Sequence, residues 1–87
     1  MKMSEDEIVA FLRTADTRGV FLCRFTDGTE VEITDPWVCR ADGTSECIAT
    51  VVREAAGVAA GAGEALCVAL AEIAEVSVSP KPWEYFR

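Results

Sequence analysis

The residues of this 87-residue chain with the greatest capacity for chemistry are four cysteines, and their spacing does not favour a metal site. They are Cys23, Cys39, Cys47 and Cys67. None forms a CxxC pair, the unit from which zinc sites are usually built, and the chain has no histidine. Each lies in an apolar run, where a thiol behaves as a small buried hydrophobe. We expect free, buried cysteines, with a Cys39–Cys47 disulfide as the main alternative, and no cofactor.

Catalytic constellations are missing from the sequence. Without histidine the chain has no imidazole base and no Ser–His or Cys–His nucleophile pair. Gly57, Gly61 and Gly63 lie among alanines and lack the Lys-Ser/Thr that completes a phosphate-binding loop. Carboxylates are plentiful, but no spacing pairs two of them as a glycosidase would. We therefore predict a protein that is not an enzyme.

Acidic residues dominate the charge of the chain. Fifteen Asp and Glu residues face eight Lys and Arg, giving a net charge of −7. Such a surface attracts basic proteins and repels phosphate backbones, so we expect a basic protein partner and no direct nucleic-acid binding. The alternative that these acids only solvate a helix start and a hairpin face stays open. The predicted contact residues are Glu5, Asp6, Glu7, Asp16, Glu30 and Glu32.

The elements that position these acids begin with a helix predicted over residues 5–15. The segment SEDE starts with a capping box, in which Ser4 and Glu7 each satisfy a backbone N–H of the other. Acidic residues in a first helical turn also interact favourably with the helix dipole. Gly19 is a natural stop after the helix. The apolar face has helical spacing and consists of Ile8, Phe11, Leu12 and Ala15.

The segment VFLCRFTDGTEVEIT alternates with period two and predicts a β-hairpin. A two-residue Asp27-Gly28 turn would place Cys23 opposite Glu32. A three-residue loop with Gly28 in the left-handed conformation instead places Cys23 opposite Val31. Because a slip of one residue moves the whole apolar set to the solvent face, we predict the three-residue loop.

The second half of the chain is predicted as further strands. Asp35-Pro36 is expected to break the second strand, which resumes at Trp37, and residues 41–43 to form another turn. The other predicted elements are strands over 47–52, 66–70 and 74–78, a loop over 54–64 and a turn over 71–73. Residues 46–76 are alanine-rich, so two helices broken near Gly61 also fit. We favour strands because 47–52 is rich in β-branched residues and EVSVSP alternates.

The remaining segment, 80–87, is a proline-stiffened tail that holds three of the seven aromatic residues. We expect a single domain over 1–79 with an aromatic of the tail folded back on its core, or else a partner-binding tail. The N-terminus lacks the features of a secretory signal, and the apolar runs are too short to span a bilayer. We therefore expect a cytoplasmic protein.

A capped helix followed by five short, bent strands resembles the Sm-like and SH3-like small β-barrels, over about residues 4–79. The resemblance implies a mainly β, α+β fold with one N-terminal helix and a five-stranded antiparallel barrel. Within that fold, three short motifs resemble the Rof (YaeO) family of Rho-termination inhibitors. They are Asp27-Gly28-Thr29-Glu30, Val52-Arg53-Glu54-Ala55-Ala56 and Val68-Ala69-Leu70-Ala71-Glu72-Ile73. The long alanine–glycine loop, the cysteines and the aromatic tail depart from the family pattern.

The Rof-like resemblance implies an acidic protein that binds the RNA-binding domain of the Rho helicase and blocks its nucleic-acid surface. Sm-like RNA binders normally carry basic residues, often with a histidine, at the nucleotide site, and this chain lacks that signature. An Sm-like RNA-binding ring is therefore the less favoured interpretation. A third is an oligomerisation domain in which a strand edge or the aromatic tail pairs with itself.

Overall fold

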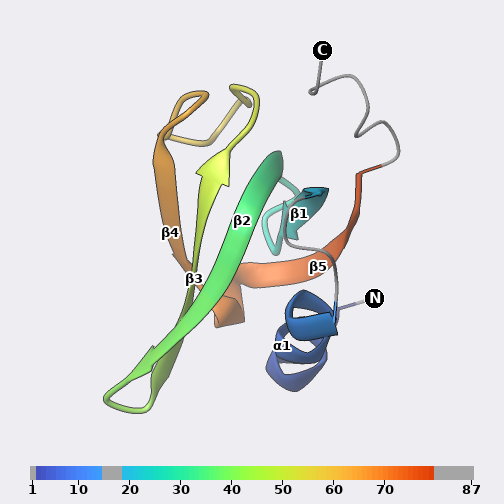
Figure 1. The fold of residues 1–87 in the computed structure, drawn as a ribbon, viewed down its shortest axis with the longest axis vertical. Helices are drawn as coiled ribbons and strands as arrows, with labels where there is room; N and C mark the ends of the chain where they lie inside the picture. Colours follow the sequence, from blue (N-terminus) through green and yellow to red (C-terminus); the bar gives the residue numbers. More distant parts are fainter. Residues whose placement is uncertain (1, 15–18, 80–87) are drawn as a thin grey trace.

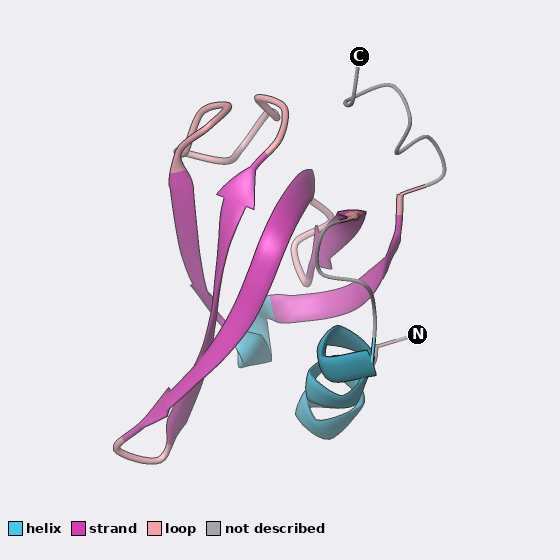
Figure 2. Ribbon diagram, in the orientation of Figure 1, coloured by secondary structure: helices cyan, strands magenta, loops and turns pink. Residues whose placement is uncertain are grey.

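The computed structural model describes residues 2–14 and 19–79 as one helix against a five-stranded antiparallel sheet (Figures 1 and 2). The elements are α1 (Glu5–Thr14), β1 (Val20–Phe25), β2 (Glu30–Ala41), β3 (Thr44–Val51), β4 (Ala65–Ala69), the 3-10 helix η1 (Leu70–Glu72) and β5 (Ile73–Val78). The strand order is β4-β3-β2-β1-β5, so the last two strands lie at opposite edges. The predicted fold class is confirmed, although the sheet curves without closing into a barrel.

Helix α1 starts at the predicted capping box. The Ser4 backbone N–H donates to Glu7 Oε1 at 3.0 Å, and the Glu7 backbone N–H donates to Ser4 Oγ at 3.1 Å. Ile8 is fully buried, and the Phe11 ring meets the Phe21 ring of β1 edge-on, with 6.0 Å between centroids. The helix thus covers the sheet beside β2, β5 and η1. The predicted last residue, Ala15, lies outside the described residues.

The first hairpin has the predicted register. The Phe25 N–H donates to the Thr29 carbonyl at 2.8 Å and closes the three-residue loop 26–28. Gly28 adopts φ 92°, a left-handed conformation that costs glycine least because it has no Cβ. The aligned pairs are Phe21 with Ile33, Cys23 with Val31 and Arg24 with Glu30. The apolar members of these pairs form the centre of the core.

The expected break at Asp35-Pro36 is wrong, because β2 continues through it as a β-bulge. Thr34 pairs with Thr50, whereas Trp37 pairs with Ile48, so three steps along β2 oppose two along β3. Asp35 takes φ 51°, and proline, which has no N–H to give to a sheet, is tolerated at such an extra residue.

This bulge reverses the side of β2 that faces the core. Val31 and Ile33 are buried before it, and Val38 packs against the core after it. Trp37 consequently points away from the core and keeps 54% of its surface exposed. Regular alternation along β2 would bury Trp37, and the bulge exposes it instead.

Residues 46–76 form strands and a loop rather than two helices, apart from the short helix η1. Strand β4 ends before Leu70, which is fully buried and starts η1 where a turn over 71–73 was predicted. The Ile73 N–H donates to the Leu70 carbonyl, and β5 begins at Ile73. The loop predicted over 54–64 is present and begins two residues earlier, at residue 52, because β3 ends at Val51. Hydrogen bonds such as that from the Gly63 N–H to the Val51 carbonyl (2.8 Å) hold it in place.

The four cysteines are free, so the alternative of a Cys39–Cys47 disulfide is not observed. Cys39 lies opposite Glu46 and Cys47 opposite Val38, which directs the two thiols to opposite faces of the β2–β3 ladder. Cys23 and Cys47 are buried as expected, but Cys39 is only half-buried and Cys67 is exposed. The expectation of four buried thiols is wrong because alternation places Cys67 on the outer face of β4.

The tail 80–87 and its aromatic residues lie outside the described residues, as does the predicted contact Asp16. The described part ends at Ser79, whose N–H donates to the Val20 carbonyl at 2.9 Å. Within the described residues, no helix combines the length and the apolar character that crossing a bilayer requires.

The capping box gives a first prediction, because each partner satisfies a backbone group of the other. Ser4→Ala should lower the free energy of unfolding by about 1 kcal/mol. Glu7→Gln should also destabilise, and the double variant should lose less than the sum of the two. Urea unfolding of the three variants measures this coupling, and strict additivity would contradict a reciprocal cap.

The same pair predicts a pH dependence. The hydrogen bond from the Ser4 backbone holds the pKa of Glu7 below its ordinary value of 4.5. A carboxyl whose pKa is lowered by folding stabilises above its unfolded pKa, and that contribution disappears as the pH falls through the folded value. The stability difference between the wild type and Glu7→Gln should therefore shrink on acidification.

Candidate functional site

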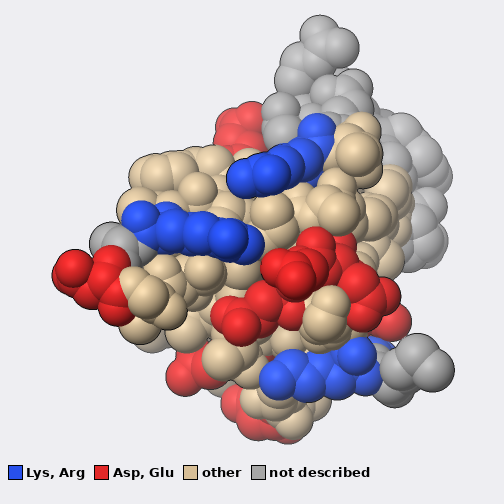
Figure 3. Space-filling model, turned by 90° about the horizontal axis from the view of Figure 1, so that it is seen from below, with Lys and Arg blue, Asp and Glu red and all other residues tan. Residues whose placement is uncertain are grey.

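The first predicted contacts, Glu5 and Asp6, lie exposed at the start of α1. The Asp6 side chain is 97% exposed, and its Oδ1 lies 3.9 Å from Arg40 Nη2 on β2. Seen from below, acidic side chains gather in the middle of the molecular face, and long basic side chains flank them (Figure 3). This face therefore carries a mixed rather than a purely acidic surface.

Glu7 and Glu32, two further acids of this prediction, have structural partners. The carboxylate of Glu7 belongs to the helix cap. The Glu32 side chain is only 24% exposed and lies 3.8 Å from Arg53 Nε. Glu30 is exposed and lies opposite Arg24 in the hairpin.

The predicted acids belong to two acidic regions, the helix start and the first hairpin. Asp6 lies 3.9 Å from Arg40 near the end of β2, whereas Glu30 begins that strand. Strands β5 and β1 connect the two regions. The Met3 N–H donates to the Ala74 carbonyl at 2.7 Å, and Arg24 pairs with both Glu75 and Glu30.

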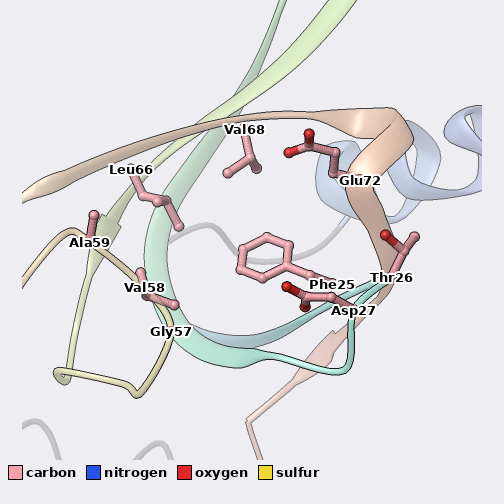
Figure 4. A pocket seen from close by; sticks show the side chains of 9 residues that line it. All are labelled: Phe25, Thr26, Asp27, Gly57, Val58, Ala59, Leu66, Val68 and Glu72. Atoms are coloured by element: carbon pink, nitrogen blue, oxygen red, sulfur yellow. The ribbon is translucent and has the colours of Figure 1, made fainter.

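A hollow that the sequence did not indicate lies at the turn of this hairpin. It measures about 410 Å³ and is lined by Phe25, Thr26, Asp27, Gly57, Val58, Ala59, Leu66, Val68 and Glu72. Figure 4 shows the Phe25 ring at its centre, with the carboxylates of Asp27 and Glu72 on one side and Val58, Leu66 and Val68 around the ring. We call this site the Phe25 hollow.

The 52–64 loop provides one wall of the Phe25 hollow because a glycine lets it approach the first hairpin. Gly57 adopts φ 83°, and a Cβ on it would lie 3.3 Å from Thr29 Oγ1. The Val58 N–H donates to the Ala55 carbonyl at 3.2 Å, which turns the chain beside this contact. From the small residues of this segment, the sequence predicted only a loop. In the structure, these residues also allow the loop to pack on the hairpin.

The two carboxylates are fixed to anchored backbone. Asp27 Oδ1 accepts the Thr29 N–H at 2.8 Å, and this hydrogen bond holds the pKa of Asp27 below its ordinary value. The Thr26 N–H donates to the Glu72 carbonyl at 2.9 Å, which ties the hairpin turn to η1. Asp27 is therefore ionised at neutral pH, beside an apolar hollow that a second carboxylate also borders.

The chemistry that this arrangement supports is recognition. Its side chains offer a ring, aliphatic groups, one hydroxyl and two carboxylates, and none of the lining residues is a cysteine, lysine or histidine. Within residues 2–14 and 19–79, no group of Asp, Glu and Cys side chains is arranged to hold a metal ion. Apolar walls with a few placed charges are typical of a ligand-binding pocket.

A second exposed feature lies on the outer face of β2, β3 and β4. Trp37 pairs with Ile48, and Ile48 pairs with Cys67, so the three side chains form one cross-strand row. The Cys67 thiol donates to Glu46 Oε2 at 2.9 Å. Sequence reasoning missed Trp37 as a surface residue, because only the bulge at Asp35 reverses the alternation there.

No family model matches this chain, and no curated protein or solved structure shows significant similarity to it. The resemblance to the Rof family therefore stays a prediction. The features that bear on function are the exposed carboxylates, the Phe25 hollow and the outer face of β2, β3 and β4 that carries Trp37.

The thiols give a second prediction, on reactivity. Burial raises the pKa of Cys23 to about 12 and that of Cys47 to about 11, so neither should react with iodoacetamide before unfolding. The hydrogen bond to Glu46 raises the pKa of Cys67 as well, which should slow alkylation of this exposed thiol.

Glu46→Gln removes the negative charge that disfavours the Cys67 thiolate, so alkylation of Cys67 should accelerate at mildly alkaline pH. Peptide mass spectrometry over a time course measures each thiol separately. The matched control is Glu54→Gln, which removes one charge from the exposed 52–64 loop. Equal Cys67 rates in the two variants would show that Glu46 does not restrain the thiol.

Proposed function

We propose that this protein is a non-enzymatic binding module that docks on a basic protein surface through its carboxylates. The observation that carries the proposal is the fully exposed helix start, where Asp6 is 97% exposed on a scaffold of net charge −7. Charges at the rim of an interface raise the association rate and make it depend on salt. Nothing in the proposal requires a chemical step.

The arginines beside some of these acids do not prevent docking. The Arg40–Asp6 and Arg24–Glu75 pairs are separated by 3.9 and 3.7 Å, and their side chains are 39–97% exposed. Exposed ion pairs at this distance contribute little stability, so a partner's cations can replace the arginines at small cost. The excess of seven negative charges persists whichever arginine pairs with which acid.

The concrete version of this proposal is inhibition of a nucleic-acid-binding protein such as the Rho termination factor. It is supported by the short motifs that resemble the Rof family, of which Asp27-Gly28 forms the first hairpin turn and Leu70–Glu72 forms η1. A partner that binds RNA offers the basic surface that an acidic domain complements. This version places the protein in the cytoplasm.

The third prediction concerns binding to the RNA-binding domain of Rho. The dissociation constant should rise steeply between low and physiological salt, because screening weakens attraction between exposed charges. Glu5→Gln/Asp6→Asn should weaken binding about fivefold at low salt. Isothermal titration calorimetry measures both effects.

The matched control for this pair is Glu54→Gln/Glu64→Gln, which removes the same charge from the 52–64 loop. In the second substitution the glutamine keeps an oxygen for the Gly61 N–H, which Glu64 Oε1 accepts at 2.7 Å. An affinity that is insensitive to salt, or equally reduced by both double variants, would contradict docking through the helix start.

A second candidate function is self-association through the outer sheet face. Trp37 is 54% exposed beside the half-buried Ile48, and β4 pairs only with β3, so its outer edge has no partner strand among the described residues. Exposed tryptophans and open strand edges are common at protein interfaces. An Sm-like RNA-binding ring is less favoured, because Arg24, Arg40 and Arg53 each lie beside a carboxylate.

The fourth prediction tests this candidate. Sedimentation velocity should show association that increases with protein concentration and that Trp37→Thr abolishes. Val78→Thr is the matched control, because Val78 is 59% exposed on β5 at the opposite edge of the sheet. A monomer at every concentration would exclude self-association and favour docking on a separate partner.

A further inference from the structure

We propose that the Phe25 hollow binds an arginine side chain of the protein partner. The inference rests on the proposed function, since it specifies which chemical group of a basic partner the domain recognises. It is supported by the size of the hollow, its central ring and two carboxylates that form no ion pair with the described part of the chain.

The size and walls of the Phe25 hollow suit a long side chain with an apolar stem. Its volume of about 410 Å³ falls at the lower end of the range for ligand pockets. Val58, Leu66 and Val68 are half-buried around it and pack against the core, so they line the hollow without closing it. The methylene groups of arginine bury favourably along such a wall while the charged end stays at the rim.

The Phe25 ring gives the hollow an aromatic centre. Phe25 ends β1, and its N–H donates to the Thr29 carbonyl, so its backbone is held by the hairpin. The ring is half-buried and packs partly against the core, with the rest of it facing the hollow (Figure 4). A cation above an aromatic face is attracted by the ring quadrupole, and arginine is the commonest partner in such contacts.

The carboxylates of Asp27 and Glu72 supply the negative charge. Asp6, Glu32 and Glu75 each have an arginine of this chain within 4 Å. In contrast, Asp27 and Glu72 are in no ion pair with any part of the chain that the structure describes. The Thr29 N–H engages only one oxygen of Asp27, which leaves acceptor capacity for an incoming donor.

An arginine side chain fits this combination of an aromatic ring and two carboxylates better than a lysine side chain does. Its planar guanidinium stacks on an aromatic ring and donates in several directions at once, whereas the lysine ammonium is compact and strongly hydrated. Phosphates and lipid headgroups with a negative charge are repelled by the same carboxylates. The chemistry of the hollow therefore selects a guanidinium on a flexible apolar stem.

The test is an NMR titration with the peptide acetyl-Gly-Arg-Gly-amide. A matched peptide carries citrulline, which keeps the shape of arginine and removes its charge. The arginine peptide should give saturable shifts of the amides of Phe25, Val58 and Leu66, and the citrulline peptide should bind about tenfold more weakly. Equal shifts with both peptides, no shifts, or shifts centred on the start of α1 would overturn the inference.

Two double variants locate the interaction. Asp27→Asn/Glu72→Gln keeps a side-chain oxygen for the Thr29 N–H and should weaken binding of the arginine peptide about tenfold. Glu5→Gln/Asp6→Asn removes the same charge at α1 and should leave that affinity unchanged. If both variants weaken the peptide equally, the peptide senses only the overall charge, and the hollow is not its site.

The two proposals can fail separately. Salt-sensitive binding to the Rho RNA-binding domain that survives Asp27→Asn/Glu72→Gln would remove the hollow and leave docking through the helix start intact. Specific binding of the arginine peptide together with no affinity for any tested basic protein would support the hollow as a guanidinium site. It would at the same time contradict the proposed docking.

Discussion

The structure depends on one constraint, the bulge at Asp35-Pro36 in β2, the strand that pairs with β1 over residues 30–34 and with β3 on both sides of the bulge. Before the bulge, Val31 and Ile33 face the core, and after it Val38 does so. A regular strand of the same length would place Trp37 inside and Val38 outside. The extra residue at Asp35-Pro36 therefore keeps apolar side chains of β2 on the core side both before and after the bulge. As a consequence, it places Trp37 on the surface.

The surfaces on which function can depend lie on different elements of this sheet and helix. The helix start lies near the Arg40 end of β2, and the Phe25 hollow lies beside the turn that precedes the strand. Each presents carboxylates on backbone held by hydrogen bonds, the Ser4–Glu7 cap in one case and the Asp27–Thr29 turn in the other. Rigid presentation lowers the conformational entropy that the domain itself loses on binding, which favours the proposed docking.

Local patterns predicted most of the fold. The capping box and the Cys23–Val31 register depend on residues close in sequence, where hydrogen bonding and alternation allow one solution. The bulge was missed because Asp35-Pro36 fits both the end of a strand and an extra residue within one, and only pairing with β3 decides between them. That pairing, in turn, explains why the exposure of Trp37 was not evident in the sequence.

The acidic helix start was found from sequence because it needs only neighbouring residues, whereas the Phe25 hollow joins the hairpin turn, the 52–64 loop, β4 and η1. The central claim, that a partner docks on carboxylates, is tested most directly by amide hydrogen exchange with and without the Rho RNA-binding domain. The account predicts slower exchange at the start of α1 and around the hollow. Protection confined to the strands that carry Trp37, with unchanged exchange in both acidic regions, would contradict it.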